Sequence, residues 1–279
     1  MKPELILEFT KMNGAGNDFV VIDNRFFNFT PDELSALASS LCRRRMSVGA
    51  DGLLGLETRN IPESVDFRMR YYNADGSPGS MCGNGARCLV QFASDGGVFR
   101  GSECTFVTDA GDYSASITEA GVRLYVPDVS SPAITGVSVP GSPERARSVW
   151  TGTEHAVCFV DNVDQYPVAT HGPALRQKRD FGPNGANVNF VGARKDGSSL
   201  SVRTWEKGVE AETLACGTGA IASAITAFES GLIDASPAAV QMKGGTLVVG
   251  FRKSGDQYRD VFLEGPTATV FRGSLPLSL

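Results

Sequence analysis

Alternating hydrophobic and polar positions predict a half-buried strand in the first half of the chain. Hydrophobic residues occupy every second position from Val65 to Tyr71, and the strand is expected to end in a turn at Asn73–Gly76. The short apolar segment Phe19–Asp23 predicts another strand. In the second half, Val188–Val191 and Leu200–Trp205 flank a turn at Lys195–Gly197, which predicts a hairpin.

Three segments carry helix signals. Thr30–Glu33 is a capping box with proline at the first helical position, so a helix is expected from there towards Arg44. Cys82–Asp95 and Cys216–Ser230 are helix-like, and glycines follow both. The second is rich in Ala, Ile and Gly, which predicts a helix buried on all sides.

The chain contains an internal duplication. Three segments of the first half match three of the second in the same order and at nearly the same separation. The matched segments are Gly14–Asn24 with Gly152–Asn162, Gly49–Asp51 with Gly185–Asn187, and Cys82–Ala86 with Cys216–Ala220. A repeat of about half the chain indicates two related domains rather than a solenoid.

These elements predict an α+β fold of two pseudo-symmetric domains. Each domain is expected to be a curved, mainly antiparallel sheet wrapped around its own central helix, with the active site in the cleft between the domains. The expected boundaries are 1–127 plus 267–279 for the N-terminal domain and 128–266 for the C-terminal domain.

Composition and charge exclude several classes of function. A net charge of −5 gives the protein no electrostatic attraction to nucleic acid, and the basic segment Arg43–Arg45 is interpreted as a solvated helix end. The apolar segment near the N-terminus is too short for a signal peptide. No segment approaches the about 18 apolar residues of a membrane span. A soluble, cytoplasmic protein is therefore expected, and the sequence does not fix whether it is a homodimer.

The cysteine pattern argues against metal binding and disulfides. The six cysteines include no C-x-x-C pair, and only two histidines are present, so no zinc site is expected. A disulfide framework would be unusual in a chain of 279 residues without a secretion signal. Four cysteines are interpreted as small buried hydrophobic residues, namely Cys42, Cys88, Cys104 and Cys158.

The other two cysteines, Cys82 and Cys216, each precede Gly-x-Gly at the start of a helix. Such a loop points backbone N–H groups at an anion, and the helix dipole favours the thiolate form of a cysteine there. Two loops of this kind facing each other would place two thiols around a bound carboxylate. This arrangement suits removal of an α-proton from one face of an amino acid and its return on the other, with no cofactor and no metal.

Three other classes of function are compatible with parts of the sequence. A thiol–disulfide exchanger usually has C-x-x-C, which the chain lacks. A cysteine hydrolase could use His155 as a base, but the second cysteine loop would then have no purpose. A non-catalytic protein could bind anions with both glycine-rich loops without needing thiols.

Four motifs resemble those of diaminopimelate epimerase, and the resemblance spans nearly the whole chain. The motifs are Lys11–Asp23, Tyr72–Ser77, Met81–Cys88 and Glu212–Gly219. Proline racemase-like enzymes share the broad fold, and proline or hydroxyproline racemisation remains the alternative. Their first cysteine is typically followed by Gly-His, whereas this chain has Gly83-Asn84.

The resemblance implies interconversion of LL- and meso-diaminopimelate without a cofactor, in the route to lysine and peptidoglycan. It makes Cys82 and Cys216 the acid–base pair and gives His155 and Glu206 an orienting role. It also implies a set of substrate-binding positions, in which glycines and their neighbours act through the backbone: Asn17, Asn73, Gly83, Asn84, Thr153, Asn187, Lys207, Gly217 and Thr218. The residues alone are also compatible with purely structural roles, because Asn17 and Asn73 could serve merely to shape turns. Glu206 could likewise be a strand-end charge, and His155 a hydrogen-bonded core residue.

The chain departs from the family pattern in three places. Thr153 replaces a common substrate-binding asparagine, and Lys207 replaces an arginine, which removes a bidentate fork for a carboxylate. The segment before Cys216 is also one residue longer, with Glu210 and Ala211 where one glycine is common. Because these changes are expected near the distal end of the substrate, they bear on substrate identity more than on reaction type.

Overall fold

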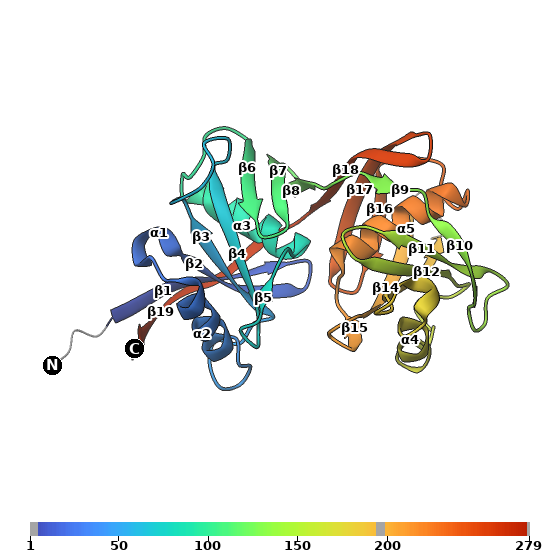
Figure 1. Ribbon diagram of the computed structural model, residues 1–279, viewed down its shortest axis with the longest axis horizontal. Helices are drawn as coiled ribbons and strands as arrows, with labels where there is room; N and C mark the ends of the chain where they lie inside the picture. The colour runs from blue at the N-terminus through green and yellow to red at the C-terminus, as the bar shows by residue number, and fades with distance from the viewer. Residues whose placement is uncertain (1–4, 194–198, 278–279) are drawn as a thin grey trace. The chain divides into compact units, whose positions relative to one another are not determined.

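The computed structural model of the protein describes residues 5–193 and 199–277, and the chain divides into two compact units (Figure 1). Unit 1 consists of Met1–Leu124 and Pro266–Leu279, and unit 2 of Tyr125–Gly265. The C-terminal strand belongs to unit 1 because it pairs antiparallel with the first strand of the chain.

The elements of the first part of the chain, with the last strand that returns to it, are β1 (Leu5–Gly14), β2 (Asn17–Asp23), α1 (Asn24–Phe27), α2 (Pro31–Leu41), β3 (Gly52–Glu57), β4 (Phe67–Asn73), β5 (Pro78–Gly79), α3 (Gly83–Asp95), β6 (Glu103–Thr108), β7 (Gly111–Thr118), β8 (Gly121–Tyr125) and β19 (Ala268–Leu277). The elements of unit 2 are β9 (Val129–Ser130), β10 (Ala133–Ser138), β11 (Arg145–Trp150), β12 (Glu154–Phe159), α4 (Val168–Arg176), the 3-10 helix η1 (Arg179–Phe181), β13 (Asn187–Ala193), β14 (Ser199–Glu206), β15 (Ala211–Thr213), α5 (Gly217–Glu229), β16 (Ala238–Met242), β17 (Gly245–Ser254) and β18 (Gln257–Gly265).

Strand pairing follows the same pattern in both units. In unit 1, β1–β2, β3–β4 and β6–β7 are antiparallel, while β2–β3 and β4–β6 are parallel. In unit 2, β11–β12, β13–β14 and β16–β17 are antiparallel, while β12–β13 and β14–β16 are parallel. The predicted α+β class, with two pseudo-symmetric and mainly antiparallel sheets, is confirmed.

Each unit holds one central helix that its own strands surround (Figure 1). Eight residues of helix α3 between Asn84 and Ala93 are buried. In α5, nearly every residue from Gly217 to Ala227 is buried. Most side chains of α5 are small and apolar, so the helix has no polar face to present to water. It can therefore be enclosed on all sides. Both predicted helices therefore occur, and α5 is buried all round as expected.

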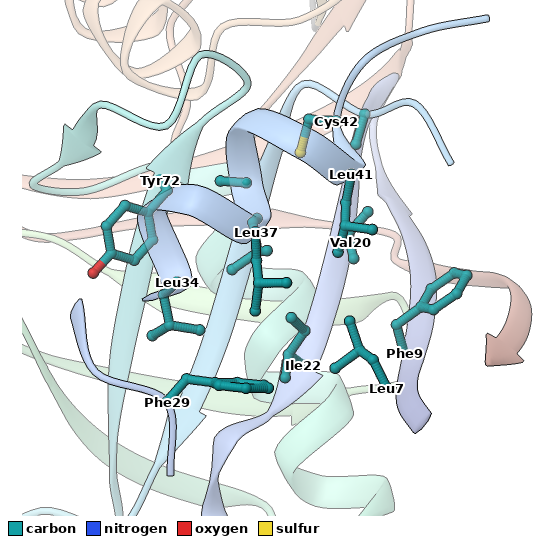
Figure 2. Packing of buried hydrophobic residues seen from close by; sticks show 13 residues of the cluster. Leu7, Phe9, Val20, Ile22, Phe29, Leu34, Leu37, Leu41, Cys42 and Tyr72 are labelled. Carbon is teal, nitrogen blue, oxygen red and sulfur yellow. The ribbon is translucent and has the colours of Figure 1, made fainter. Parts of the chain in front are cut away.

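Helix α2 covers the other face of the unit 1 sheet. Its residues Leu34, Leu37 and Leu41 share one buried cluster with Val20 and Ile22 of β2 (Figure 2). The predicted capping box is present, since the Thr30 hydroxyl accepts from the Glu33 N–H and the Glu33 carboxylate accepts from the Thr30 N–H. These bonds satisfy N–H groups that a helix start leaves without partners.

Two other expectations have mixed outcomes. Strands β13 and β14 pair antiparallel up to Ala193 and Leu200, as the hairpin pattern predicts, although the turn at Lys195–Gly197 lies outside the described residues. Arg44 follows α2 and is exposed, but it is more than a solvated helix end. Its guanidinium binds the carboxylates of Asp18 and Asp51 at 2.5 and 2.7 Å.

Replacing Thr30 with alanine removes one capping bond of α2 and is expected to lower the free energy of unfolding by about 1 kcal/mol. Chemical denaturation of the purified variant measures this change. Ser40→Ala is the control, because Ser40 is exposed at the other end of α2. A Thr30→Ala loss no larger than that of Ser40→Ala would show that the cap contributes nothing.

Candidate active site

Cys82 and Cys216 occupy equivalent positions at the starts of the two central helices. Cys82 is the N-cap of α3 with φ −138° and ψ 115°, and Cys216 is the N-cap of α5 with φ −129° and ψ 108°. The carbonyl of each accepts the first helical bond, from Ala86 at 2.8 Å and from Ala220 at 2.9 Å. The duplicated motif therefore gives both cysteines one backbone geometry.

The residues after each cysteine form the first helical turn, whose N–H groups have no acceptor within the helix. These residues are Gly83-Asn84 in unit 1 and Gly217-Thr218 in unit 2. Together with the positive end of the helix dipole, such a turn can bind a carboxylate. This is the chemical capacity that the sequence predicts for both loops.

In unit 1 the second residue of the loop joins a hydrogen-bonded chain of carboxamides. Asn84 Nδ2 donates to Asn17 Oδ1 at 2.7 Å, and Asn17 Nδ2 donates to Asp51 Oδ2 at 2.8 Å. Asp51 in turn binds Arg44. Asn17 thus contacts the cysteine loop rather than only shaping a turn.

Arg87 of α3 lies beneath the same loop and was not foreseen from the sequence. Its Nη2 donates to Asn84 Oδ1 at 2.8 Å and its Nη1 to the Gly83 carbonyl at 3.3 Å. The guanidinium is 0% exposed, and burial lowers its pKa to about 10. Both its bonds fix the loop that begins at Cys82. The only available signal was a charged residue at a helix position otherwise expected to face the core.

In unit 2 the equivalent contact joins Thr218 to His155. His155 Nε2 lies 3.0 Å from Thr218 Oγ1, which is itself 3.5 Å from Cys216 Sγ. The duplication aligns His155 with Asn17 and Thr218 with Asn84. In both units, therefore, the residue two positions after the cysteine contacts a residue near the start of the matching strand. That strand is β2 in unit 1 and β12 in unit 2.

His155 is completely buried on β12 and is held at both ring nitrogens. Its Nδ1 lies 3.0 Å from Asn189 Nδ2 on the neighbouring strand β13. Burial lowers the pKa of His155 to about 3, with the Lys207 charge adding to the effect. The imidazole is therefore neutral at physiological pH.

Two further predicted residues, Thr153 and Lys207, contact Glu154, and a third, Asn187, contacts Lys207. Lys207 Nζ forms an ion pair with the Glu154 carboxylate, and Thr153 Oγ1 lies 3.3 Å from it. The Lys207 N–H donates to Asn187 Oδ1 at 2.8 Å. Lys207 lowers the pKa of Glu154 against the effect of burial, so the pair is charged.

Two other predicted site residues, Asn73 and Glu206, each lie at the end of a strand. Asn73 ends β4, and its side chain bonds Tyr71 and Ser77 within its own turn at 2.9 and 3.0 Å. Glu206 is the half-buried last residue of β14, next to Lys207. The inserted Glu210 has φ +55° and pairs with Arg176 at 2.7 Å, so the longer segment is tied to α4.

The other four cysteines are buried and unpaired with one another, as predicted. Burial raises the pKa of Cys42, Cys88, Cys104 and Cys158 to about 12 in each case. These groups remain protonated thiols at physiological pH, which leaves Cys82 and Cys216 as the candidates for thiolate chemistry.

Among the residues that the structure describes, no cluster of His, Cys, Asp or Glu side chains has the geometry to hold a metal ion. Within the same residues, no helix is long and apolar enough to span a membrane.

The fold is that of several solved enzymes and predicted enzymes. A phenazine biosynthesis protein of the PhzF family from Bacillus anthracis superposes with a TM-score of 0.72 at 14% identity, covering 98% of this chain and 100% of that one. A probable proline racemase from Agrobacterium radiobacter gives a TM-score of 0.69 at 16% identity, covering 98% and 93%. These likenesses show that the chain has the fold that PhzF-family and proline racemase-like proteins share.

Sequence comparison identifies the family within this class. The diaminopimelate epimerase family model matches residues 9–130 and 147–270. Diaminopimelate epimerase of Chlorobaculum tepidum is 43% identical over 95% of this chain and its own full length, and that of Flavobacterium psychrophilum is 37% identical over 96% and its full length. The chain belongs to the diaminopimelate epimerase family and is an isomerase.

Replacing Asn84 with alanine leaves the buried Arg87 without its carboxamide acceptor. Because hydrogen bonds to buried charged groups contribute strongly, the free energy of unfolding should fall by about 2 kcal/mol in chemical denaturation. Gln91→Ala on the exposed side of α3 is the control and should change it by less than about 0.5 kcal/mol. Equal losses in the two variants would contradict this role of Asn84.

The lowered pKa of His155 predicts a pH-dependent stability. The unfolded chain binds a proton at His155 below about pH 6.5, whereas the folded protein does so only near pH 3. This contribution is complete above pH 6.5 and is lost as the pH falls from there towards 3, by up to about 1.4 kcal/mol per pH unit. Denaturation midpoints measured across this range should show a shallower slope for His155→Gln than for the wild type. Identical slopes in His155→Gln and the wild type would refute the assignment.

Proposed function

We propose that this protein interconverts LL- and meso-diaminopimelate by moving the α-proton between Cys82 and Cys216 without a cofactor. The observation that carries the proposal is the equivalence of the two cysteines, each the N-cap of a central helix in a unit of the same topology. Membership of the diaminopimelate epimerase family supports the substrate. In this role the enzyme supplies a precursor of lysine and peptidoglycan.

The proposed reaction consists of two proton transfers. One cysteine as thiolate takes the α-hydrogen with its bonding electrons left on carbon, and the charge spreads onto the α-carboxylate. The other cysteine, as thiol, donates its proton to the opposite face of that carbon and becomes the thiolate. The backbone N–H groups of Gly83-Asn84 and Gly217-Thr218 would hold the carboxylate as it gains charge.

The surroundings of each remaining side chain support the role proposed for it. Asn17 and Asn84 form one hydrogen-bonded surface beside Cys82, and His155 supports the loop of Cys216 through Thr218. Asn187 fixes the backbone at Lys207, adjacent to Glu206, which would orient the reacting amino group. Asn73 would bind substrate from the end of β4.

The distal end of the substrate is proposed to meet Thr153 and Lys207. Lys207 is paired with Glu154. A second carboxylate would share Lys207 with Glu154, while the distal ammonium would gain the Glu154 carboxylate as a partner. A substrate with both charges at its far end fits this pair better than proline, which has no distal charges. A cytoplasmic location is part of the proposal.

Substrate choice is tested by offering LL-diaminopimelate, proline and hydroxyproline to the purified enzyme and following optical rotation. Diaminopimelate should be turned over fastest, because it alone can use the Lys207–Glu154 pair. Faster turnover of proline or hydroxyproline would replace this assignment with a racemase of the same fold.

The two-base mechanism predicts a specific isotope pattern in deuterated water. Early product formed from one pure stereoisomer should carry deuterium at its α-carbon, because the donor thiol has exchanged with solvent, while recovered substrate stays largely unlabelled. A single base serving both faces would return the original hydrogen in part, or label both pools alike. Mass spectrometry and proton NMR distinguish these patterns.

Cys82→Ala and Cys216→Ala should each lower epimerisation in both directions by at least about a thousandfold, since each residue acts as acid one way and base the other. Cys104→Ala is the matched control, because Cys104 is a buried thiol away from both loops, and it should retain activity. Near-normal turnover by either loop variant would exclude the two-base mechanism.

A further inference from the structure

A continuous chain of hydrogen bonds runs through unit 2 to the sulfur of Cys216. It begins at Thr204 on β14, passes through Asn189 on β13 and His155 on β12, and reaches Thr218 at the start of α5. Thr204, Asn189 and His155 are completely buried. Gly219 permits the close approach, because a Cβ there would lie 2.4 Å from Asn189 Oδ1.

The orientation of the Asn189 carboxamide follows from its neighbours. Its Nδ2 lies 3.2 Å from the Ala156 carbonyl, which can only accept, and its Oδ1 lies 2.9 Å from the Thr204 hydroxyl. The second N–H of the amide therefore points at His155 Nδ1. A nitrogen that accepts cannot carry a proton, so a neutral imidazole must hold its proton on Nε2.

This tautomer sets the direction of the remaining bonds. The His155 Nε2–H donates to Thr218 Oγ1 at 3.0 Å, and the single hydroxyl proton of Thr218 is then available to Cys216 Sγ at 3.5 Å. With the opposite tautomer, Nε2 would accept and the Thr218 proton would turn away from the sulfur. A hydroxyl that donates to sulfur stabilises the thiolate over the thiol.

We propose that Asn189 is a positioning residue for Cys216, because its amide fixes the His155 tautomer that makes the Thr218 hydroxyl a donor to the thiolate. The inference rests on the proposed function in taking Cys216 to act as a thiolate. The duplication supports it. In unit 1 the strand pairing puts Gly52 at the position equivalent to Asn189, and Asn17 replaces the histidine, so no tautomer needs fixing.

Nitrogen-15 NMR of the histidine side chains tests the tautomer directly. The chain has only two histidines, so His171→Gln assigns the signals. His155 in the otherwise native protein should be a neutral Nε2–H tautomer throughout about pH 5–8. Asn189→Leu, which removes the amide but keeps a side chain of similar size, should shift His155 towards the Nδ1–H form. Retention of the pure Nε2–H form in Asn189→Leu would overturn the proposal.

Alkylation of Cys216 tests the far end of the chain. Iodoacetamide labelling, quantified on the peptide that contains Cys216, should slow about tenfold at neutral pH in Asn189→Leu and in Thr218→Val. Thr218→Ser keeps the hydroxyl and should label at the native rate. Ser223→Ala, a buried polar-to-apolar change on α5 outside this chain, is the control and should also label normally.

Thr218→Val keeps the inference testable if Asn189→Leu fails to fold, because Thr218 is only half-buried. Unchanged labelling of Cys216 in Thr218→Val would overturn the proposal. In the epimerase assay, Asn189→Leu should lower kcat about tenfold with little change in KM. Neither NMR nor alkylation requires turnover, so a protein inactive on diaminopimelate that passes both tests would refute the proposed function and leave the hydrogen-bond chain intact.

Discussion

The start of each central helix is the constraint on which the site depends. Helices α3 and α5 are buried along most of their length, and their backbone N–H groups are satisfied within the helix except in the first turn. Those first N–H groups need acceptors, and a substrate carboxylate is a suitable one. Placing a cysteine as the N-cap puts sulfur beside the same groups. The proposed binding and proton transfer would therefore both depend on one local geometry, which occurs once in each unit.

The two units solve the problem of supporting this loop in different ways. In unit 1 the carboxamides of Asn84 and Asn17 lead to the charged groups of Asp51 and Arg44, with the buried Arg87 beneath. In unit 2 the equivalent groups are the Thr218 hydroxyl and the His155 imidazole. The next side chain in the hydrogen-bonded chain is the neutral amide of Asn189. Duplication preserved the positions of the contacts, while their chemistry diverged. An asymmetric pair suits a reaction in which one sulfur is charged when the other is protonated.

The sequence was sufficient for features that depend on local patterns. The capping box of Thr30–Glu33, the helices after Cys82 and Cys216, and the pseudo-symmetry all follow from spacing and repetition. Contacts between segments far apart in the sequence could not be predicted from such local patterns. Arg87, Glu154 and Asn189 became visible only when strands β12 and β13 and the two helix starts were placed in space. The repeat did hold part of this information, since it aligns Asn17 with His155 and Asn84 with Thr218.

The environment of His155 also decides between two chemistries that the sequence left open. A cysteine hydrolase needs an imidazole that accepts a proton from its thiol and later returns it, which requires a pKa near neutrality. Burial lowers the pKa of His155 to about 3, and the Thr218 hydroxyl lies between the ring and the sulfur. The ring nitrogen facing Asn189 accepts a bond of its own. His155 is thus built to hold a fixed hydrogen-bond direction rather than to exchange protons, and a reaction that leaves proton transfer to the sulfurs is the one this arrangement serves.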